Sequence, residues 1–120
     1  MPIDDAIPEG DAARRQNETG SVVSIGLPDT VAQRLAGQRP IVSLAVKDIH
    51  TAGLDRQDNV EIGCLLLGGD MDALDIITNL GKAGFCGVVT VFSPLLPNPR
   101  MVERELRSAG KAMTVRLVVR

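Results

Sequence analysis

The chain has 120 residues, a formal net charge of −2 and a hydrophobic fraction of 44%. This length fits one compact domain, and no apolar run approaches the roughly 18–20 residues of a membrane-spanning helix, so we expect a soluble protein without a membrane partner. The charge lacks the basic excess that nucleic-acid binding requires, and two cysteines with one histidine are too few for a structural zinc site.

Residues 1–20 differ from the rest of the chain in composition. They carry five acids against two bases and no periodic apolar face, so we expect a disordered acidic tail before a domain over residues 21–120. A tail that docks on a partner is the alternative. No signal peptide is evident, and Cys64 and Cys86 both lie in apolar surroundings, which indicates reduced, buried thiols and a cytoplasmic location.

From Ser21 onward, short β-branched runs alternate with helical periodicity, which is the pattern of an α/β fold with a parallel sheet. Helices are expected from residue 29 to Gly37, around Ala73 to Leu80, and from 98 to 110, with Asp29 or Thr30 capping the first and Asn98 the last. Residues 48–59 indicate only a short helical turn and loop. The strand-like runs are 22–25, 41–46, 62–67, 87–92 and 113–119.

Five strands joined by four connections, each long enough for a right-handed crossover, predict a flavodoxin-like sheet with strand order 2-1-3-4-5. The third run is apolar without alternation, which is typical of a central strand covered on both faces. Few residues remain after the fifth run, so we expect the closing helix of this architecture to be missing or atypical.

Ligand sites of open parallel sheets lie at the carboxyl ends of the strands, where Asp29, Asp70 and Asp72 are expected. Three carboxylates there could hold Mg²⁺ weakly, but each also stands near a helix start, where capping and the helix dipole explain it. Gly68 and Gly69 would let a ligand approach a helix N-terminus, although a tight turn explains the pair equally well. We therefore expect no metal and no cofactor, and keep these residues as a candidate ligand rim.

The nucleophilic residue types give no catalytic pattern. His50 has no acid partner in the sequence, and both thiols are expected to be buried and inert. Ser93, at the end of the fourth run, is the one hydroxyl in a loop position that families of this architecture use. The sequence therefore predicts a protein that is not an enzyme.

The order of elements, the segment from Gly68 to Leu80 and the hydroxyl of Ser93 after Val-Val-Thr-Val-Phe resemble the receiver domain of bacterial two-component response regulators. The likeness covers residues 21–120, and Met71-Asp72-Ala73-Leu74 resembles the Met-Asp-Gly-Leu opening of the family's third helix. It implies Mg²⁺-assisted phosphorylation of an aspartate after the third strand, a Ser/Thr switch at Ser93, and a signalling face on the fourth helix and fifth strand.

Carried over residue by residue, that phosphorylation chemistry fails. The family's acidic pair falls on Gly26-Leu27, its phosphoacceptor on Leu67 or Gly68, and its lysine at best on Arg120, while no tyrosine is present. Asp70 is the nearest substitute acceptor, but it lies two or three residues late, where in-line phosphoryl transfer needs a different geometry. The resemblance therefore implies a pseudo-receiver, a phosphorylation-independent signalling scaffold.

A missing closing helix would leave one side of the first and fifth strands uncovered, so we expect a second copy, the tail or further sequence to cover it. Residues 98–120 hold six bases against two acids. We predict a homodimer, or binding to a signalling protein or output domain, through the fourth helix and fifth strand. The basic residues of this predicted interaction surface are Arg100, Arg104, Arg107, Lys111 and Arg116.

The first functional hypothesis is a non-catalytic signal-transduction module that works through protein–protein contact. The alternative is a small-ligand or anion sensor that uses the loops at the carboxyl ends of the strands. A phosphoacceptor at Asp70 is a third possibility. The anti-sigma-factor antagonist fold also fits cytoplasmic signalling, but its opening paired strands are hard to find in residues 21–46.

Overall fold

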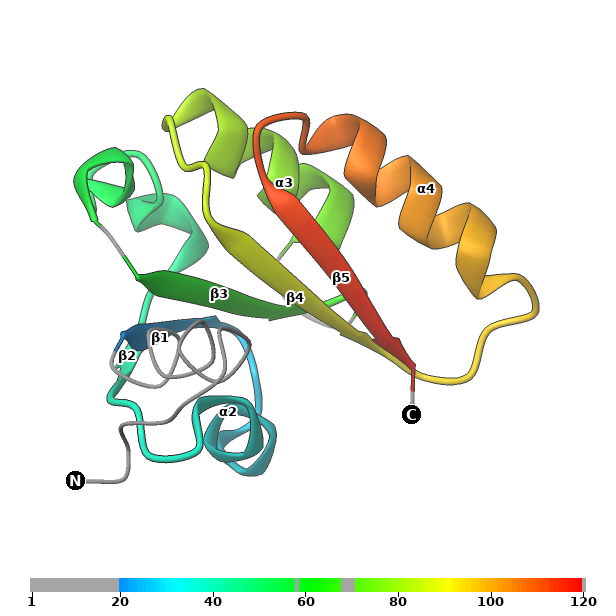
Figure 1. Cartoon of the computed structure of the whole chain (residues 1–120), viewed down its shortest axis with the longest axis horizontal. Coiled ribbons are helices and arrows are strands. Elements are labelled where there is room, and N and C mark those ends of the chain that lie inside the picture. Colours follow the sequence, from blue (N-terminus) through cyan, green and yellow to red (C-terminus); the bar gives the residue numbers. More distant parts are fainter. Residues whose placement is uncertain (1–19, 58, 68–70, 120) are drawn as a thin grey trace, which may run out of the picture.

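The computed structural model describes residues 20–57, 59–67 and 71–119 (Figure 1). Its five strands form one parallel sheet in the order β2-β1-β3-β4-β5, so the predicted flavodoxin-like α/β fold is confirmed. The predicted tail lies outside the described residues except for Gly20. The strands are β1 (Ser21–Ile25), β2 (Ile41–Ser43), β3 (Val60–Leu65), β4 (Val88–Ser93) and β5 (Thr114–Val119).

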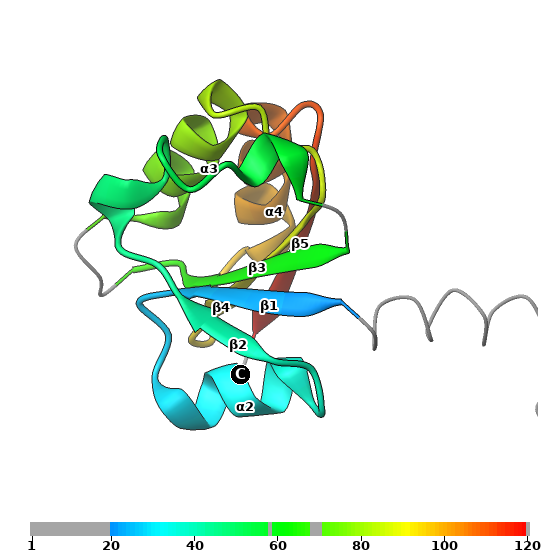
Figure 2. The same ribbon diagram turned by 90° about the vertical axis from the view of Figure 1, so that its left-hand side faces the viewer.

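The helices lie on both faces of the sheet. They are α2 (Asp29–Ala36), α3 (Ala73–Lys82) and α4 (Pro99–Ala109), with two 3-10 turns, η2 (Val46–Asp48) and η3 (Leu54–Arg56), between β2 and β3. Figure 2 shows α2 on one side of the sheet, next to β1 and β2, and α3 and α4 on the other side. None of the described helices is long and apolar enough to cross a membrane.

The helix starts follow the expected capping chemistry in two cases out of three. The Asp72 carboxylate accepts from the Asp75 amide at 2.9 Å, and Asn98 accepts from Met101 at 3.2 Å. The prediction that Asp29 or Thr30 caps α2 is wrong, because Pro28 occupies the cap position and no side chain caps this helix. Asp29 is instead the first helical residue, where its negative charge interacts favourably with the positive end of the helix dipole.

The main core lies between the sheet and the pair α3 and α4. The apolar stripe predicted for α3 is buried there, against the strand residues that alternate toward this side. We call this side of the sheet the core face. Its strand residues are Val23, Ile25, Val60, Ile62, Cys64, Val89, Val91 and Val115.

Two predicted strands have wrong boundaries, and the second of them, β3, also ends at Leu65 instead of residue 67. Strand β2 ends at Ser43, because the chain turns into η2 instead of continuing to residue 46. Strand β3 begins at Val60, two residues early, because Val60 and Glu61 pair with the start of β1. A charged residue therefore lies inside the central strand.

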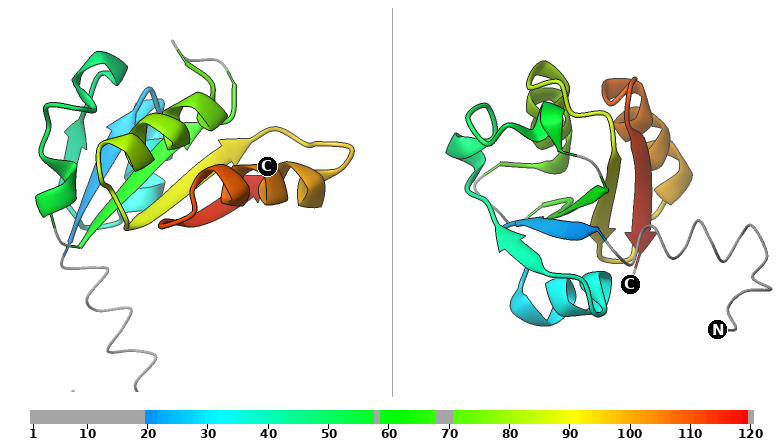
Figure 3. Two further views of the ribbon diagram at one scale, coloured as in Figure 1. Left: turned by 90° about the horizontal axis from the view of Figure 1, so that it is seen from above. Right: turned by 60° about the vertical axis from the view of Figure 1, so that its left-hand side comes forward.

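The second side of the sheet is only partly covered. Helix α2 contacts β1 and β2, and its Leu35 reaches across to β3, where a Cβ on Gly63 would lie 2.6 Å from the Leu35 side chain. Within the described residues no helix covers β4 and β5 on this side, and Figure 3 shows the same arrangement from two further directions. The uncovered strands are thus β4 and β5, whereas β1, which we expected to be exposed, lies under α2.

We call this uncovered area the open face. Its residues alternate with those of the core face along each strand, and the strand register places Thr90 beside Arg116 and Phe92 beside Val118. The open face consists of Glu61, Leu65, Val88, Thr90, Phe92, Thr114, Arg116 and Val118.

Candidate functional site

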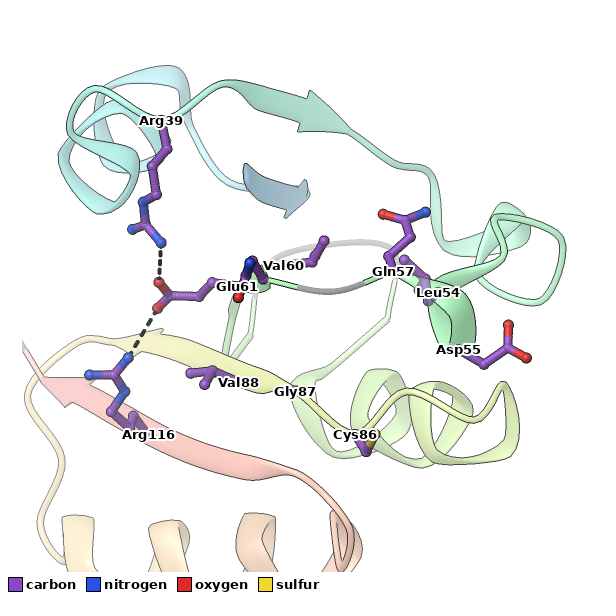
Figure 4. A pocket seen from close by; sticks show the side chains of 11 residues that line it. Arg39, Leu54, Asp55, Gln57, Val60, Glu61, Cys86, Gly87, Val88 and Arg116 are labelled. Atoms are coloured by element: carbon purple, nitrogen blue, oxygen red, sulfur yellow. Dashed lines mark hydrogen bonds and ion pairs between the residues drawn. The ribbon is translucent and has the colours of Figure 1, made fainter. Parts of the chain in front are cut away.

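A buried carboxylate lies at one end of the open face. Glu61 is 8% exposed, and its Oε1 lies 3.0 Å from Nη1 of Arg39. Its Oε2 accepts from the Thr90 hydroxyl and lies 3.5 Å from Nη2 of Arg116 (Figure 4). Both carboxylate oxygens therefore have donors, which compensates for the loss of water around a buried charge.

The two guanidinium groups of this cluster reach Glu61 from opposite sides, as Figure 4 shows. Arg39 follows α2 and also donates to the backbone carbonyls of Leu35 and Ala36, so it ties the end of α2 to the central strand. The side chains of Arg39 and Glu61 are equally buried, at 10% exposed each, whereas the Arg116 side chain is 55% exposed. Arg39 is thus structural, and Arg116 keeps donors that face solvent.

Two hollows adjoin this ion cluster. One, of about 290 Å³, lies at the amino ends of the strands and is lined by the cluster together with Leu54, Gln57 and Cys86. The other, of about 270 Å³, lies along the open face and has a different chemistry, because apolar groups form much of its wall. Its lining residues are Arg34, Leu35, Glu61, Thr90, Phe92, Arg116 and Val118.

The open face is therefore polar at one end and apolar at the other. Leu65 and Phe92 are half-buried and pack on a small cluster formed by Leu27 and the α2 residues Val31 and Ala32. Val118, on the edge strand, is 38% exposed. An apolar strip beside an exposed guanidinium suits the binding of an amphipathic surface better than it suits bond-breaking chemistry.

The predicted ligand rim is only partly described. Gly68, Gly69 and Asp70 lie outside the described residues. Asp29 and Asp72 begin helices on opposite faces of the sheet, so the structure does not bring these two carboxylates together. Among the described residues, no three histidine, cysteine, aspartate or glutamate side chains form a group that could hold a metal ion.

A hollow of about 180 Å³ opens at the carboxyl end of β1, where the receiver family would place its acidic pair. Gly26 is in its wall, and each described lining residue has an apolar or glycine side chain. The described side chains of this part of the rim offer apolar contact and no charge. The lining residues are Ile25, Gly26, Leu44, Ala45, Val46, Met71 and Ile76.

The polar residues singled out in the sequence have local hydrogen-bond partners. Ser93 is the last residue of β4, is buried, and donates to the Pro94 carbonyl at 2.7 Å. Nε2 of His50 lies 3.0 Å from Oδ1 of Asn79 on α3. Each contact explains the residue structurally, and the switch role of Ser93 stays a prediction.

The two cysteines differ in environment. Cys64 lies in the core, as expected, and burial raises the pKa of its thiol to about 12. The prediction that Cys86 is buried is wrong, because Phe85 takes the buried position and Cys86 faces outward into the hollow at the amino ends of the strands.

The five basic residues of the predicted interaction surface are divided between the two sides of the sheet. Arg100, Arg104 and Lys111 are exposed on or just after α4. Arg107 folds onto β5, where its Nε donates to the Val115 carbonyl at 3.3 Å and its Nη2 lies 3.5 Å from Glu103. Arg116 belongs to the open face, on the opposite side from α4.

Sequence reasoning missed Glu61, Arg39 and Thr90. The signal that could have revealed Glu61 is the alternation of Val60, Ile62 and Cys64, since an extended strand turns the intervening residue to the other face. Its partners carry no comparable signal.

Comparisons with family models, with curated proteins and with solved structures found no match to this chain.

Proposed function

We propose that this domain is a non-catalytic signal-transduction module of the pseudo-receiver type, which acts by binding an amphipathic helix of a partner protein on its open face. The observation that carries this proposal is the open face itself, where an apolar strip lies next to the exposed guanidinium of Arg116 and the buried ion cluster.

The apolar strip favours a helix as the bound element. Parallel sheets are normally covered by helices on both faces, and α2, beside β1 and β2, is the one described helix on this face. Phe92 and Val118 line a hollow that runs alongside β4 and β5. A helix in this position would remove their exposed area from water, at about 25 cal/mol for each Å² of apolar surface.

The charges around the hollow favour an acidic partner. Arg34, Arg39 and Arg116 stand on this side, and Glu61 already interacts with two of them. Among the residues that the structure describes, the exposed charge that lines the hollow is positive, at Arg34 and Arg116. A helix with an aspartate or glutamate beside its apolar stripe would therefore match the open face in both shape and charge.

The alternative, an anion or small-ligand sensor at the carboxyl ends of the strands, has weaker support from the geometry. The hollow at the end of β1 has an apolar described lining, and Asp72 is engaged as a helix cap. Basic groups that would hold an anion are instead concentrated on the open face.

The non-catalytic part of the proposal follows from the positions of Gly26, Leu27 and Leu67. Leu27 is packed under α2, and none of the three side chains can ionise or accept a phosphoryl group. We expect the mass of the intact protein to stay unchanged after incubation with Mg²⁺ and acetyl phosphate. A phosphorylated adduct that is lost on Asp70→Asn would contradict a phosphorylation-independent module.

Partner binding is tested by selecting displayed helical peptides on the immobilised full chain and measuring the affinity of the selected peptides. We expect apolar residues at helical spacing with an adjacent acid, and at least about tenfold weaker binding to Val118→Lys. Val42→Lys is the matched control, because it places the same change on an exposed valine of another strand. Failure to select any binder, or equal loss with both variants, would overturn the assignment of this face.

A further inference from the structure

The two edges of the sheet are protected to different degrees. On β5, the outward amide of Leu117 donates to Oε2 of Glu103 at 3.3 Å, and the outward carbonyl of Val115 accepts from Nε of Arg107 at 3.3 Å. Two side chains of α4 thus occupy backbone groups that another strand would need. The edge that the sequence suggested for pairing is partly occupied.

The outer edge of β2 has no such protection in the described part of the chain. Val42 is 53% exposed and Ile41 is 39% exposed, and all three residues of this strand are exposed. Proteins usually cover edge strands or place charged residues on them, because exposed backbone and β-branched side chains promote pairing. Two large apolar residues on an uncovered edge strand therefore point to a contact.

The hydrogen-bond pattern of β2 shows which backbone groups are available. The Val22 amide donates to the Pro40 carbonyl, and the Leu44 amide donates to the Ser24 carbonyl. Residues 40, 42 and 44 therefore turn their backbone groups toward β1, and Ile41 and Ser43 turn theirs to the outer edge.

We propose that β2 is a self-association surface, on which two copies of this chain pair their β2 strands antiparallel about a twofold axis at Val42. In this register Ile41 of each copy lies opposite Ser43 of the other, and each such pair exchanges both of its N–H and C=O groups. Val42 lies opposite the same residue of the second copy, so the two exposed side chains cover each other.

A second copy fits this edge better than the chain's own tail. Pairing is confined to a short segment, because Pro40 precedes the strand and η2 begins at Val46. Residues 1–19 contain Pro2 and Pro8 and have no β-branched run, so they are poor strand formers. The outward N–H and C=O groups belong to Ile41 and Ser43, which lie on either side of Val42. This edge can therefore pair with an identical edge, as a twofold interface requires.

This inference concerns a different surface from the proposed partner site. It is tested by sedimentation equilibrium of the full chain over roughly a hundredfold range of concentration. We expect a monomer–dimer equilibrium whose dissociation constant rises at least about tenfold in Val42→Lys, because two ammonium groups would face each other. Val118→Lys, the matched change on the open face, should leave the dimer intact.

The twofold axis allows a stricter test. Val42→Lys and Val42→Glu should each be monomeric alone and should dimerise when mixed, because only an antiparallel pair centred on residue 42 brings the two new charges together. A parent chain that stays monomeric throughout the range would overturn the proposal, as would a dimer that Val42→Lys leaves unchanged. Loss of self-association in Val118→Lys alone would instead place the second copy on the open face.

Discussion

Along β3, β4 and β5, alternate residues form the core face and the open face, and the two faces differ in burial and in charge. On β5, Val115 is 2% exposed against α3 and α4, whereas Val118 is 38% exposed on the other side. On β3, Ile62 and Cys64 point into the apolar core. Glu61, which precedes Ile62, points to the other side and forms ion pairs with two arginines.

The two sides of the strands therefore contribute differently to the molecule. The core face gains stability from apolar burial under two helices. The open face holds a buried charge cluster at one end and exposed apolar groups at the other, and it is the surface that we propose for partner binding.

The largest expected effect on folding comes from the ion cluster. Glu61→Gln would leave the buried guanidinium of Arg39 without its opposite charge, and breaking a buried pair in this way costs about 3–5 kcal/mol. The free energy of unfolding from urea denaturation should fall by this amount, while Glu105→Gln on the exposed surface of α4 should change it by less than about 0.5 kcal/mol. A loss below about 1 kcal/mol in Glu61→Gln would show that the cluster is solvated and not a structural centre.

A matched pair of valines sharpens the comparison between the faces. Val115→Ala removes methyl groups from the core and should lower the free energy of unfolding by about 2 kcal/mol. Val118→Ala, on the same strand, should lower it by less than about 0.5 kcal/mol, because this side chain is already in contact with water. Equal losses would mean that the open face is covered in solution.

The two cysteines allow a test of how stability depends on pH and of which thiol is accessible. Burial raises the pKa of Cys64 to about 12 from 9.0, so the folded state holds this proton more tightly than the unfolded state. The stabilisation is complete below pH 9 and is lost as the pH rises from 9.0 to about 12. The free energy of unfolding of the parent chain should fall across this pH window, whereas that of Cys64→Ala should not fall in this way. At pH 8, a thiol reagent should modify only Cys86 in the folded protein. Rapid modification of both thiols would contradict a closed core face.

Much of the fold could be predicted from the sequence because local patterns decide it. The β-branched runs, the apolar stripe from Ala73 to Leu80 and the Asn98-Pro99 start of α4 each act within a few residues. The strand order followed from the number of runs and the length of their connections. The start of β3 was missed because a glutamate is unusual in a central strand.

The site could not be predicted in the same way. Arg39, Thr90 and Arg116 are 22, 29 and 55 residues from Glu61. Thr90 and Arg116 meet it because neighbouring strands turn alternate side chains to one face, and Arg39 reaches it from the connection between α2 and β2. Helix coverage decides which of the two faces is open. No local sequence pattern reveals these long-range contacts or the helix coverage. The sequence therefore predicted a site in the loops at the carboxyl ends of the strands instead.

A charge exchange between the open face and a bound helix is the most direct test of the central claim. The affinity of the selected acidic helical peptide is measured for the parent chain, for Arg34→Glu and, as a control, for Arg104→Glu on the outer side of α4. We predict that Arg34→Glu weakens binding at least about tenfold, that a peptide with lysine in place of its acid regains the affinity on this variant, and that Arg104→Glu binds as the parent does. Equal affinity for the parent and Arg34→Glu, or loss only in Arg104→Glu, would contradict partner binding on the open face.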